Sequence, residues 1–327
     1  MKFFSLIVLT ALAWNVSAKA EDCSSIDVRE SLPADVKTFL TTPSDQGDTG
    51  WCYGYAATDL VSQAIGTPVS ALHLSTYYSS QIGFWGKLGR AVTGNGGTTP
   101  QGGFLPTAIH EIADLGYACK EKDLPSKGTY DVWLSSQTKV EAGMSALIYS
   151  LQQFRKNQCD LYCDKKIEQL TKDFFPAISA ADLKKYVRNN SRVKLEDAIF
   201  NFADSQCRYK AVPLKNTRLE YSTYLKPARI GGNIVQAIDA ALDRRRLVGM
   251  EYNAAYITNV GGNMGASHAS TIVGRKKIGG VCHYLVRNSW GDTCDYRASV
   301  ICVKNQGSYW VPAETLERMI VRATWIN

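Results

Sequence analysis

Four side chains with the chemistry of a nucleophilic site lie in two distant regions of the sequence. Cys52 lies in the run DQGDTGWCYGYA, His268 lies far downstream in the run SHA, and Asn288 begins the run NSWG. A thiol, an imidazole and a carboxamide in that chain order are the components of a site where cysteine attacks an acyl carbon. Gln46, six residues before the cysteine, offers an amide donor for an oxyanion. The pattern predicts acyl-transfer chemistry at Cys52.

Cys52 stands where a helix is expected to begin. Apolar residues recur at helical spacing from Tyr53 to Ile65, and the run 66–68 (Gly-Thr-Pro) stops the pattern. A helix N-terminus and a neighbouring imidazolium each lower the pKa of a thiol, from about 8.5 to as low as about 3.5. The alternative is an inert buried cysteine. Because a Gln-Gly turn precedes the thiol and an imidazole is available, we expect a reactive thiolate.

A predicted β-hairpin selects the partner imidazole. The run 276–280 (Lys-Lys-Ile-Gly-Gly) is typical of a turn that joins a strand over 269–275 to a strand over 281–287. If the turn centres on residue 278, the numbers of cross-strand partners sum to about 556, so His268 faces Asn288. The amide would then bond one imidazole nitrogen and leave the other for the thiol.

The other three histidines fit this role less well. His283 lies about 17 Å from Asn288 along an extended strand, at ~3.4 Å per residue. His110 falls on an amphipathic helix beside Glu111, so we predict it to be a surface or boundary residue. His73 lies in a second predicted helix, where we predict a packing role. We therefore predict His268 as the acid–base group.

The Gln-Gly-x-x-Gly-x-Cys spacing and the Asn-Ser-Trp-Gly run resemble the papain-like cysteine peptidases. The resemblance implies peptide-bond hydrolysis, with Cys52 as nucleophile, His268 as acid and base, Asn288 orienting the imidazole and Gln46 as oxyanion donor. It also implies a polypeptide substrate and a two-lobe fold, with a helical first lobe and an antiparallel second lobe. In that family His and Asn usually follow Cys by about 130–150 residues; both gaps are wider here, by roughly the length of one inserted segment.

The resemblance also assigns substrate-binding residues. Gly102, Gly103, Phe104 and Leu105 match a Gly-Gly segment whose backbone pairs with extended substrate, and Trp290 matches a tryptophan that shields the orienting amide. The pocket for the second side chain before the cut would be lined by four apolar residues, which favours Leu, Val or Phe there: Phe104, Leu105, Ala266 and Ala269.

The order of expected elements indicates an α+β protein. Helical periodicity covers 53–65, about 68–78, 104–115 and 234–242, whereas the last third is strand-like over 247–252, 269–273, 284–287 and 300–303. Helices followed by an antiparallel sheet are typical of that class. The stretch from about 128 to 223 is rich in Lys, Gln, Leu and Ala and has helical periodicity. We interpret it as a helical insertion.

Residues 1–20 have the pattern of a secretory signal peptide. Lys2 precedes an apolar run over 3–13, and small residues near 16–20 offer a cleavage site. The run is shorter than the ~20 residues of a spanning helix, which disfavours the alternative of an uncleaved anchor. We expect a mature domain of 21–327 that is secreted or periplasmic, without stable membrane insertion.

The cysteine count and the net charge limit which kinds of site and binding partner are expected. Nine cysteines leave one free thiol, Cys52, and eight for up to four disulfides of undetermined pairing, which suits an oxidising compartment. A zinc site at Cys159 and Cys163 is the alternative, but no histidine or second close pair stands nearby, so neither a metal nor a cofactor is expected. The net charge of +7 includes no basic stripe with aromatic residues, so nucleic-acid binding is not expected. The oligomeric state stays open.

Two other functions use the same features. A papain-like scaffold could bind a peptide or protein without turnover, but such a binder has no need of all four site residues. An acyl or amide transferase could use the same thiol, and the sequence does not separate it from a hydrolase.

Overall fold

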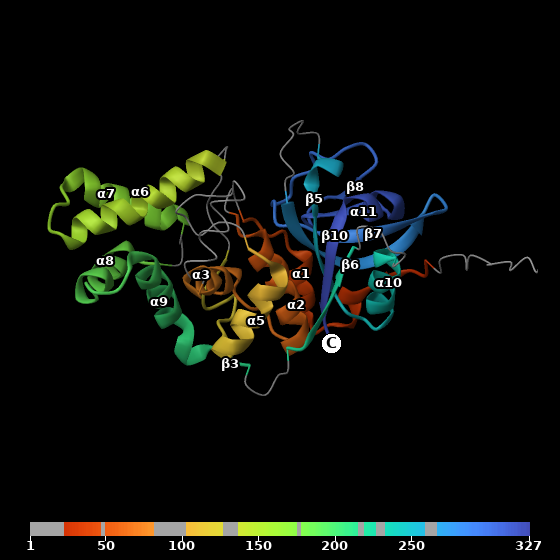
Figure 1. Ribbon diagram of the computed structural model, residues 1–327, viewed down its shortest axis with the longest axis horizontal. Helices are drawn as coiled ribbons and strands as arrows, with labels where there is room; N and C mark the ends of the chain where they lie inside the picture. Colours follow the sequence, from red (N-terminus) through yellow and green to blue (C-terminus); the bar gives the residue numbers. More distant parts are fainter. Residues whose placement is uncertain are drawn as a thin grey trace, which may run out of the picture.

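The structure is a computed structural model that describes residues 23–46, 50–81, 103–126, 137–174, 178–214, 219–226, 233–258 and 267–327. The predicted signal peptide and the predicted binding residues Gly102 and Ala266 lie outside the described residues. Figure 1 shows an antiparallel sheet on the right, the helices of residues 137–207 on the left, and the helices of residues 34–115 between them. Among the described residues no helix is long and apolar enough to span a bilayer.

Four helices form the middle of the molecule, and two of them end at a glycine. They are α1 (Ala34–Thr41), α2 (Cys52–Ile65), α3 (Ala71–Gln81) and α5 (Leu105–Leu115). Gly66 after α2 and Gly116 after α5 have φ of 67° and 80°, a region that favours glycine and ends a helix. The helices expected at 53–65, 68–78 and 104–115 are therefore confirmed within three residues.

Helix α2 packs against the sheet through its apolar face. Leu60 and Val61 are fully buried, and burying one such side chain contributes about 1.5–3 kcal/mol. A Cβ at Gly249 would lie 2.5 Å from Cδ1 of Leu105 and 3.1 Å from Cδ1 of Leu60. Glycine at this position therefore allows the sheet to approach the two helices, which fixes the helix carrying Cys52 against the strands.

One eight-stranded antiparallel sheet forms the other half. Its order is β4-β10-β5-β6-β7-β9-β8, with β1 paired to β6. This arrangement confirms the predicted α+β class. The strands are β1 (Ile26–Asp27), β4 (Tyr221–Leu225), β5 (Val248–Asn253), β6 (Ser267–Ile278), β7 (Val281–Arg287), β8 (Ile301–Val303), β9 (Ser308–Pro312) and β10 (Ile320–Ile326). Two helices lie among the later strands in sequence: α10 (Ile234–Asp243) follows β4, and α11 (Ala313–Met319) follows β9.

The β6–β7 hairpin has a different register from the predicted one. Its turn is the pair Gly279-Gly280, with φ of 59° and 81°, as in a two-residue hairpin turn. Ile278 pairs with Val281, and after a bulge near residue 273 Thr271 pairs with Arg287. Continuing that register sets residue 288 opposite 270 and residue 290 opposite 268. The predicted sum of 556 is therefore wrong by two to three residues.

Four helices occupy the stretch predicted as an insertion. They are α6 (Gln137–Arg155), α7 (Leu161–Phe174), α8 (Ala180–Asn189) and α9 (Leu195–Cys207). The chain then returns to the body of the molecule: β3 (Val212–Pro213) pairs with β2 (Tyr117–Ala118), and β4 pairs with β10 in the main sheet. The helical part thus ends before residue 223, because the last residues of the predicted range belong to the sheet.

All nine cysteines are described, and Cys52 is the free one. The pair Cys159–Cys163 forms a disulfide, so the zinc alternative for those two sulfurs is wrong. Four disulfides are typical of extracellular proteins. The pairs are Cys23–Cys282, Cys119–Cys207, Cys159–Cys163 and Cys294–Cys302.

A buried guanidinium joins three elements that carry predicted site residues. Arg287, at the end of β7, is 3% exposed and forms an ion pair of 3.3 Å with Asp59 on α2. It also donates to the Ser44 hydroxyl at 2.8 Å and to three backbone carbonyls at the end of α1: Leu40 at 3.0 Å, Phe39 at 3.1 Å and Thr42 at 3.2 Å. One side chain thereby holds the segment that leads into Gln46.

We expect Arg287→Lys to destabilise the fold. An ammonium cannot reproduce the planar fork of donors, so carbonyls at the end of α1 lose their hydrogen-bond partners, although a positive charge stays near Asp59. Each buried carbonyl left without a donor costs about 1–3 kcal/mol, and urea unfolding would measure the loss. The matched control is Arg318→Lys in the exposed pair with Glu314, where little change is expected. Equal unfolding midpoints for the two variants would contradict the assignment.

Candidate active site

The thiol of Cys52 lies at the first residue of α2, against the sheet. Its side chain is half-buried, and it forms hydrogen bonds with the backbone of Ala269 and of Tyr53. Ala269 follows His268 directly on β6. The helix start and the strand that carries the predicted imidazole therefore meet at the sulfur.

His268 and Asn288 are hydrogen-bonded to each other. Nε2 of His268 lies 2.8 Å from Oδ1 of Asn288, although the register sets these residues two positions apart rather than opposite. Such diagonal neighbours on one face of a sheet are within reach of long side chains. The residue opposite Asn288 is Ser270, whose hydroxyl donates to the same Oδ1 at 3.0 Å.

The bonds around Asn288 determine which imidazole nitrogen carries hydrogen. The backbone N–H of Ser289 reaches Oδ1 of Asn288 at 2.9 Å, and since an N–H can only donate, the atom it contacts must be the amide oxygen. Nε2 of neutral His268 is therefore the protonated nitrogen. Nδ1 then has the lone pair and can accept a proton.

Aromatic rings enclose the imidazole. Trp290 stacks on His268 with ring centroids 4.3 Å apart, and Tyr252 meets the ring edge-on at 5.5 Å. The hydroxyl of Tyr296 accepts from Nδ2 of Asn288 at 3.1 Å. His268 is 6% exposed and Asn288 is 1% exposed, so water has little access to their hydrogen bond.

Gln46 lies beside the segment that follows Asn288. Its backbone N–H donates to the carbonyl of Ser289 at 2.9 Å, and its Oε1 accepts from the Ser289 hydroxyl. A bridge between Asp45 and Trp290 continues this pairing. Because the acceptor end of the amide is engaged by Ser289, the donor end is the one that could meet an oxyanion.

Burial opposes both charges of a thiolate–imidazolium pair. It raises the pKa of the Cys52 thiol to about 11, although hydrogen bonds with the backbone of Ala269 and Tyr53 lower the value in part. Burial likewise lowers the pKa of His268 to about 4, against the hydrogen bond with Asn288, which raises it. Desolvation at the sulfur therefore acts against the predicted resting thiolate, which stays a prediction. At neutral pH the geometry favours a thiol and a neutral imidazole.

Glu251 is a charged neighbour that the sequence did not single out. Its charge raises the pKa of Cys52, and its carboxylate accepts from the Leu105 N–H at 2.9 Å and pairs with Arg322 at 2.6 Å. Phe104 lies under the Arg322 guanidinium, 5.5 Å from ring centroid to Cζ. An ion pair therefore borders the segment predicted to bind substrate.

The predicted substrate-binding residues differ in accessibility. Phe104 is 59% exposed, whereas Leu105 and Ala269 are buried, and their role in a substrate pocket stays a prediction. A Cβ at Gly103 would lie 2.8 Å from ring carbons of Tyr53, so glycine lets this segment lie close to α2. Trp290 lies on the His268 ring, and its shielding of the orienting amide stays a prediction.

The remaining histidines lie away from Cys52 in other pairings. His283 contacts the Val281 carbonyl, and exposed His110 pairs with Asp114. His73 is fully buried against Asp204. Its ring also lies within 4.8 Å of the sulfurs of Cys119 and Cys207, the described group closest to metal-binding geometry, but these two sulfurs are bonded to each other.

Comparisons with known proteins give matches among solved structures alone. No family model matches the chain, and no curated protein matches it. It is similar to a digestive procathepsin L 3 of Tenebrio molitor larval midgut at 15% identity, covering 95% of this chain and 72% of that one, with a TM-score of 0.46. A procathepsin B S9 from Trypanosoma congolense matches at 12% identity over 93% and 76% of the chains, TM-score 0.45. The proform of the ragweed pollen cysteine protease Amb a 11 matches at 13% over 94% and 66%, TM-score 0.45.

We expect the alkylation rate of Cys52 to keep rising up to about pH 11. The thiolate is the reactive species, and a raised thiol pKa leaves it a minor population at neutral pH. Iodoacetamide modification followed by mass spectrometry across pH measures this. Glu251→Gln should shift the curve to lower pH by removing a nearby negative charge, whereas the exposed control Glu314→Gln should not. A plateau below ~8.5, the ordinary thiol value, would show that an ion pair with His268 forms instead.

Proposed function

We propose that this chain is an exported, papain-like cysteine peptidase. The single observation that carries the proposal is the meeting of a free thiol at the start of α2 with the backbone next to His268, whose Nε2 is held by Asn288 at 2.8 Å. This bond leaves Nδ1 as the basic nitrogen, and a base aligned by a third group is the arrangement that activates a cysteine nucleophile.

The first half-reaction transfers an acyl group to sulfur. The Cys52 sulfur attacks the scissile carbonyl carbon while its proton passes to Nδ1 of His268. A neutral pair suits this concerted transfer, because burial disfavours the charged form of each group. The oxyanion that forms would accept hydrogen bonds from the Gln46 side-chain amide and from the Cys52 backbone N–H at the helix start.

Breakdown of the tetrahedral intermediate completes this first half-reaction, and hydrolysis of the thioester then restores the enzyme. His268 gives its proton to the leaving amine as the carbon–nitrogen bond breaks, which leaves a thioester on Cys52. Nδ1 then takes a proton from water, whose oxygen attacks the thioester carbon, and the thiolate takes the proton back as the acid leaves. Asn288 keeps the ring in one tautomer and orientation during both steps.

Export is proposed on two features. The four disulfides of the described residues suit an oxidising compartment, and residues 1–20 have a secretory pattern. The substrate is then a polypeptide outside the cytoplasm. A transferase would use the same thioester with an amine in place of water, so product analysis distinguishes the two reactions.

We expect Cys52→Ala to abolish peptide hydrolysis with little change in thermal stability, because the thiol belongs to no disulfide. A peptide-library digest followed by mass spectrometry measures cleavage, and an epoxide directed at thiols should label the wild-type protein at residue 52. Turnover by the variant near the wild-type rate would contradict the proposal. Binding of peptides by both proteins without cleavage by either would favour the scaffold function.

We expect Gln46→Ala to lower kcat by about 10²–10³, the usual loss when one oxyanion donor is removed. KM should change little, because the hydrogen bond from Gln46 to the oxyanion forms only in the transition state. The matched control is Gln63→Ala, which also removes two side-chain bonds, to Arg245 and Leu247, at the far end of α2. The oxyanion assignment fails if both variants lose the same fraction of kcat.

A further inference from the structure

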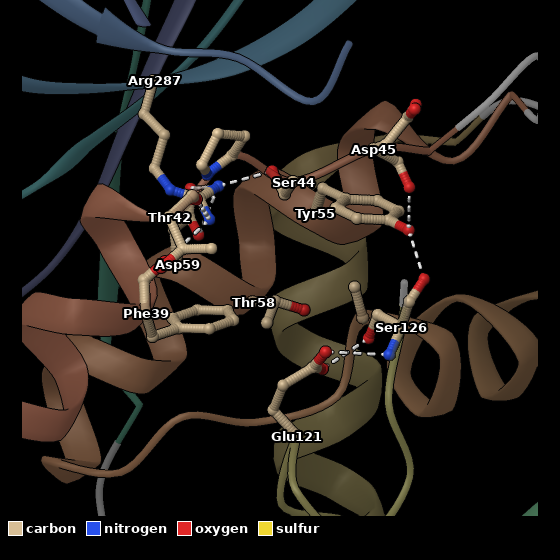
Figure 2. Close-up of a pocket in the computed structure, with 12 residues that line it drawn as sticks. Phe39, Thr42, Ser44, Asp45, Tyr55, Thr58, Asp59, Glu121, Ser126 and Arg287 are labelled. Carbon is tan, nitrogen blue, oxygen red and sulfur yellow. Dashed lines mark hydrogen bonds and ion pairs between the residues drawn. The ribbon is translucent and has the colours of Figure 1, made fainter. Parts of the chain in front are cut away.

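A cavity lies beside α2, apart from the site described above. Its volume is about 190 Å³, and its walls are the end of α1, the middle of α2 and the segment 121–126 (Figure 2). Since one water takes about 30 Å³ of liquid volume, this space exceeds what a single water or ion fills. None of the four proposed catalytic side chains lines it.

Glu121 brings a half-buried carboxylate to the wall, and no cation of the described residues forms an ion pair with it. Its two oxygens accept from the backbone N–H and the hydroxyl of Ser126, at 2.8 and 2.6 Å. Across the part of the chain that the structure describes, no Lys, Arg or His nitrogen lies within ion-pair distance of Glu121. Arg287 on the opposite wall is engaged by Asp59 and by carbonyls of α1. Burial raises the pKa of Glu121 to about 7, against the hydrogen bonds from Ser126 and the more distant charge of Arg287, which lower it.

Thr58 supplies a second, independent feature. Its residue is 1% exposed, and its hydroxyl has no hydrogen-bond partner in the described structure. Figure 2 shows this hydroxyl pointing from α2 toward Glu121 and Ser126. Buried hydroxyls nearly always have a partner, so an unsatisfied one that points toward a carboxylate indicates a group that is supplied from outside.

The rest of the cavity lining favours a ligand with a short apolar chain. Phe39, Pro43 and Ala71 contribute apolar surface to the same cavity. We propose that this cavity binds a small primary alkylammonium compound. Glu121 pairs with the ammonium, whose N–H also donates a hydrogen bond to the Thr58 hydroxyl, and the alkyl chain lies against Phe39. An ammonium carries three donors, which suits the acceptors that converge here.

The test measures binding of n-propylammonium chloride to the full chain by saturation-transfer NMR. A probe of this size is expected to bind with Kd on the order of 10⁻⁴–10⁻² M. Saturable binding is expected for the ammonium but not for 1-propanol or sodium propionate at equal concentration, because the charged head is the recognised group. Potassium chloride should not displace the probe if the cavity selects an organic cation.

Two variants and two controls locate the binding. Glu121→Gln keeps an acceptor for Ser126 but removes the charge, and should weaken binding about tenfold or more; Thr58→Val removes the hydroxyl at nearly constant shape and should weaken it several-fold. Glu314→Gln on the surface and Thr171→Val, another buried hydroxyl without a partner, should bind as wild type. The proposal is overturned if wild type shows no saturable binding, if propanol binds equally well, or if neither Glu121→Gln nor Thr58→Val weakens binding.

Discussion

The structure depends on one charge that is held away from water. A guanidinium with 3% exposure must have every donor satisfied, and Arg287 satisfies its donors with carbonyls of α1, the Ser44 hydroxyl and the carboxylate of Asp59. Those partners precede Gln46 or lie on the helix of Cys52, and the residue after Arg287 is Asn288. Three segments distant in sequence are thus set in one geometry by the solvation requirement of a single side chain.

Much of the candidate site followed from local sequence patterns. Periodicity and stop signals predicted α2 and α5, and the predicted hairpin set His268 near Asn288. The register error had a specific cause: the turn is the glycine pair 279–280 rather than a loop centred on 278, and the bulge near 273 takes back one residue of the resulting shift. The predicted His268–Asn288 contact survives because their long side chains bridge a diagonal pair. Ser270 was recognisable too, since it shares a strand face with His268.

What the sequence could not provide are interactions between distant, unpatterned residues. Nothing local marks Tyr296 as the partner of Asn288, Glu251 as a charge near Cys52, or Asp59 as the counter-ion of Arg287. The desolvation of the thiol was missed for a related reason. A helix start is visible in sequence, but the degree of desolvation at the sulfur depends on how closely β6 packs against the start of α2.

The Cys23–Cys282 disulfide closes a covalent ring that spans 259 residues of separation. Cys52 and His268 lie inside this ring, and Asn288 lies just outside it. A single backbone cut anywhere within the ring leaves one molecule, because both products stay joined through the two sulfurs. The protein could thus be nicked in a surface segment and keep thiol, imidazole and carboxamide together, which would help a protein that works among proteases. Reduction would remove this tolerance, so its resistance to fragmentation depends on the redox state of its surroundings.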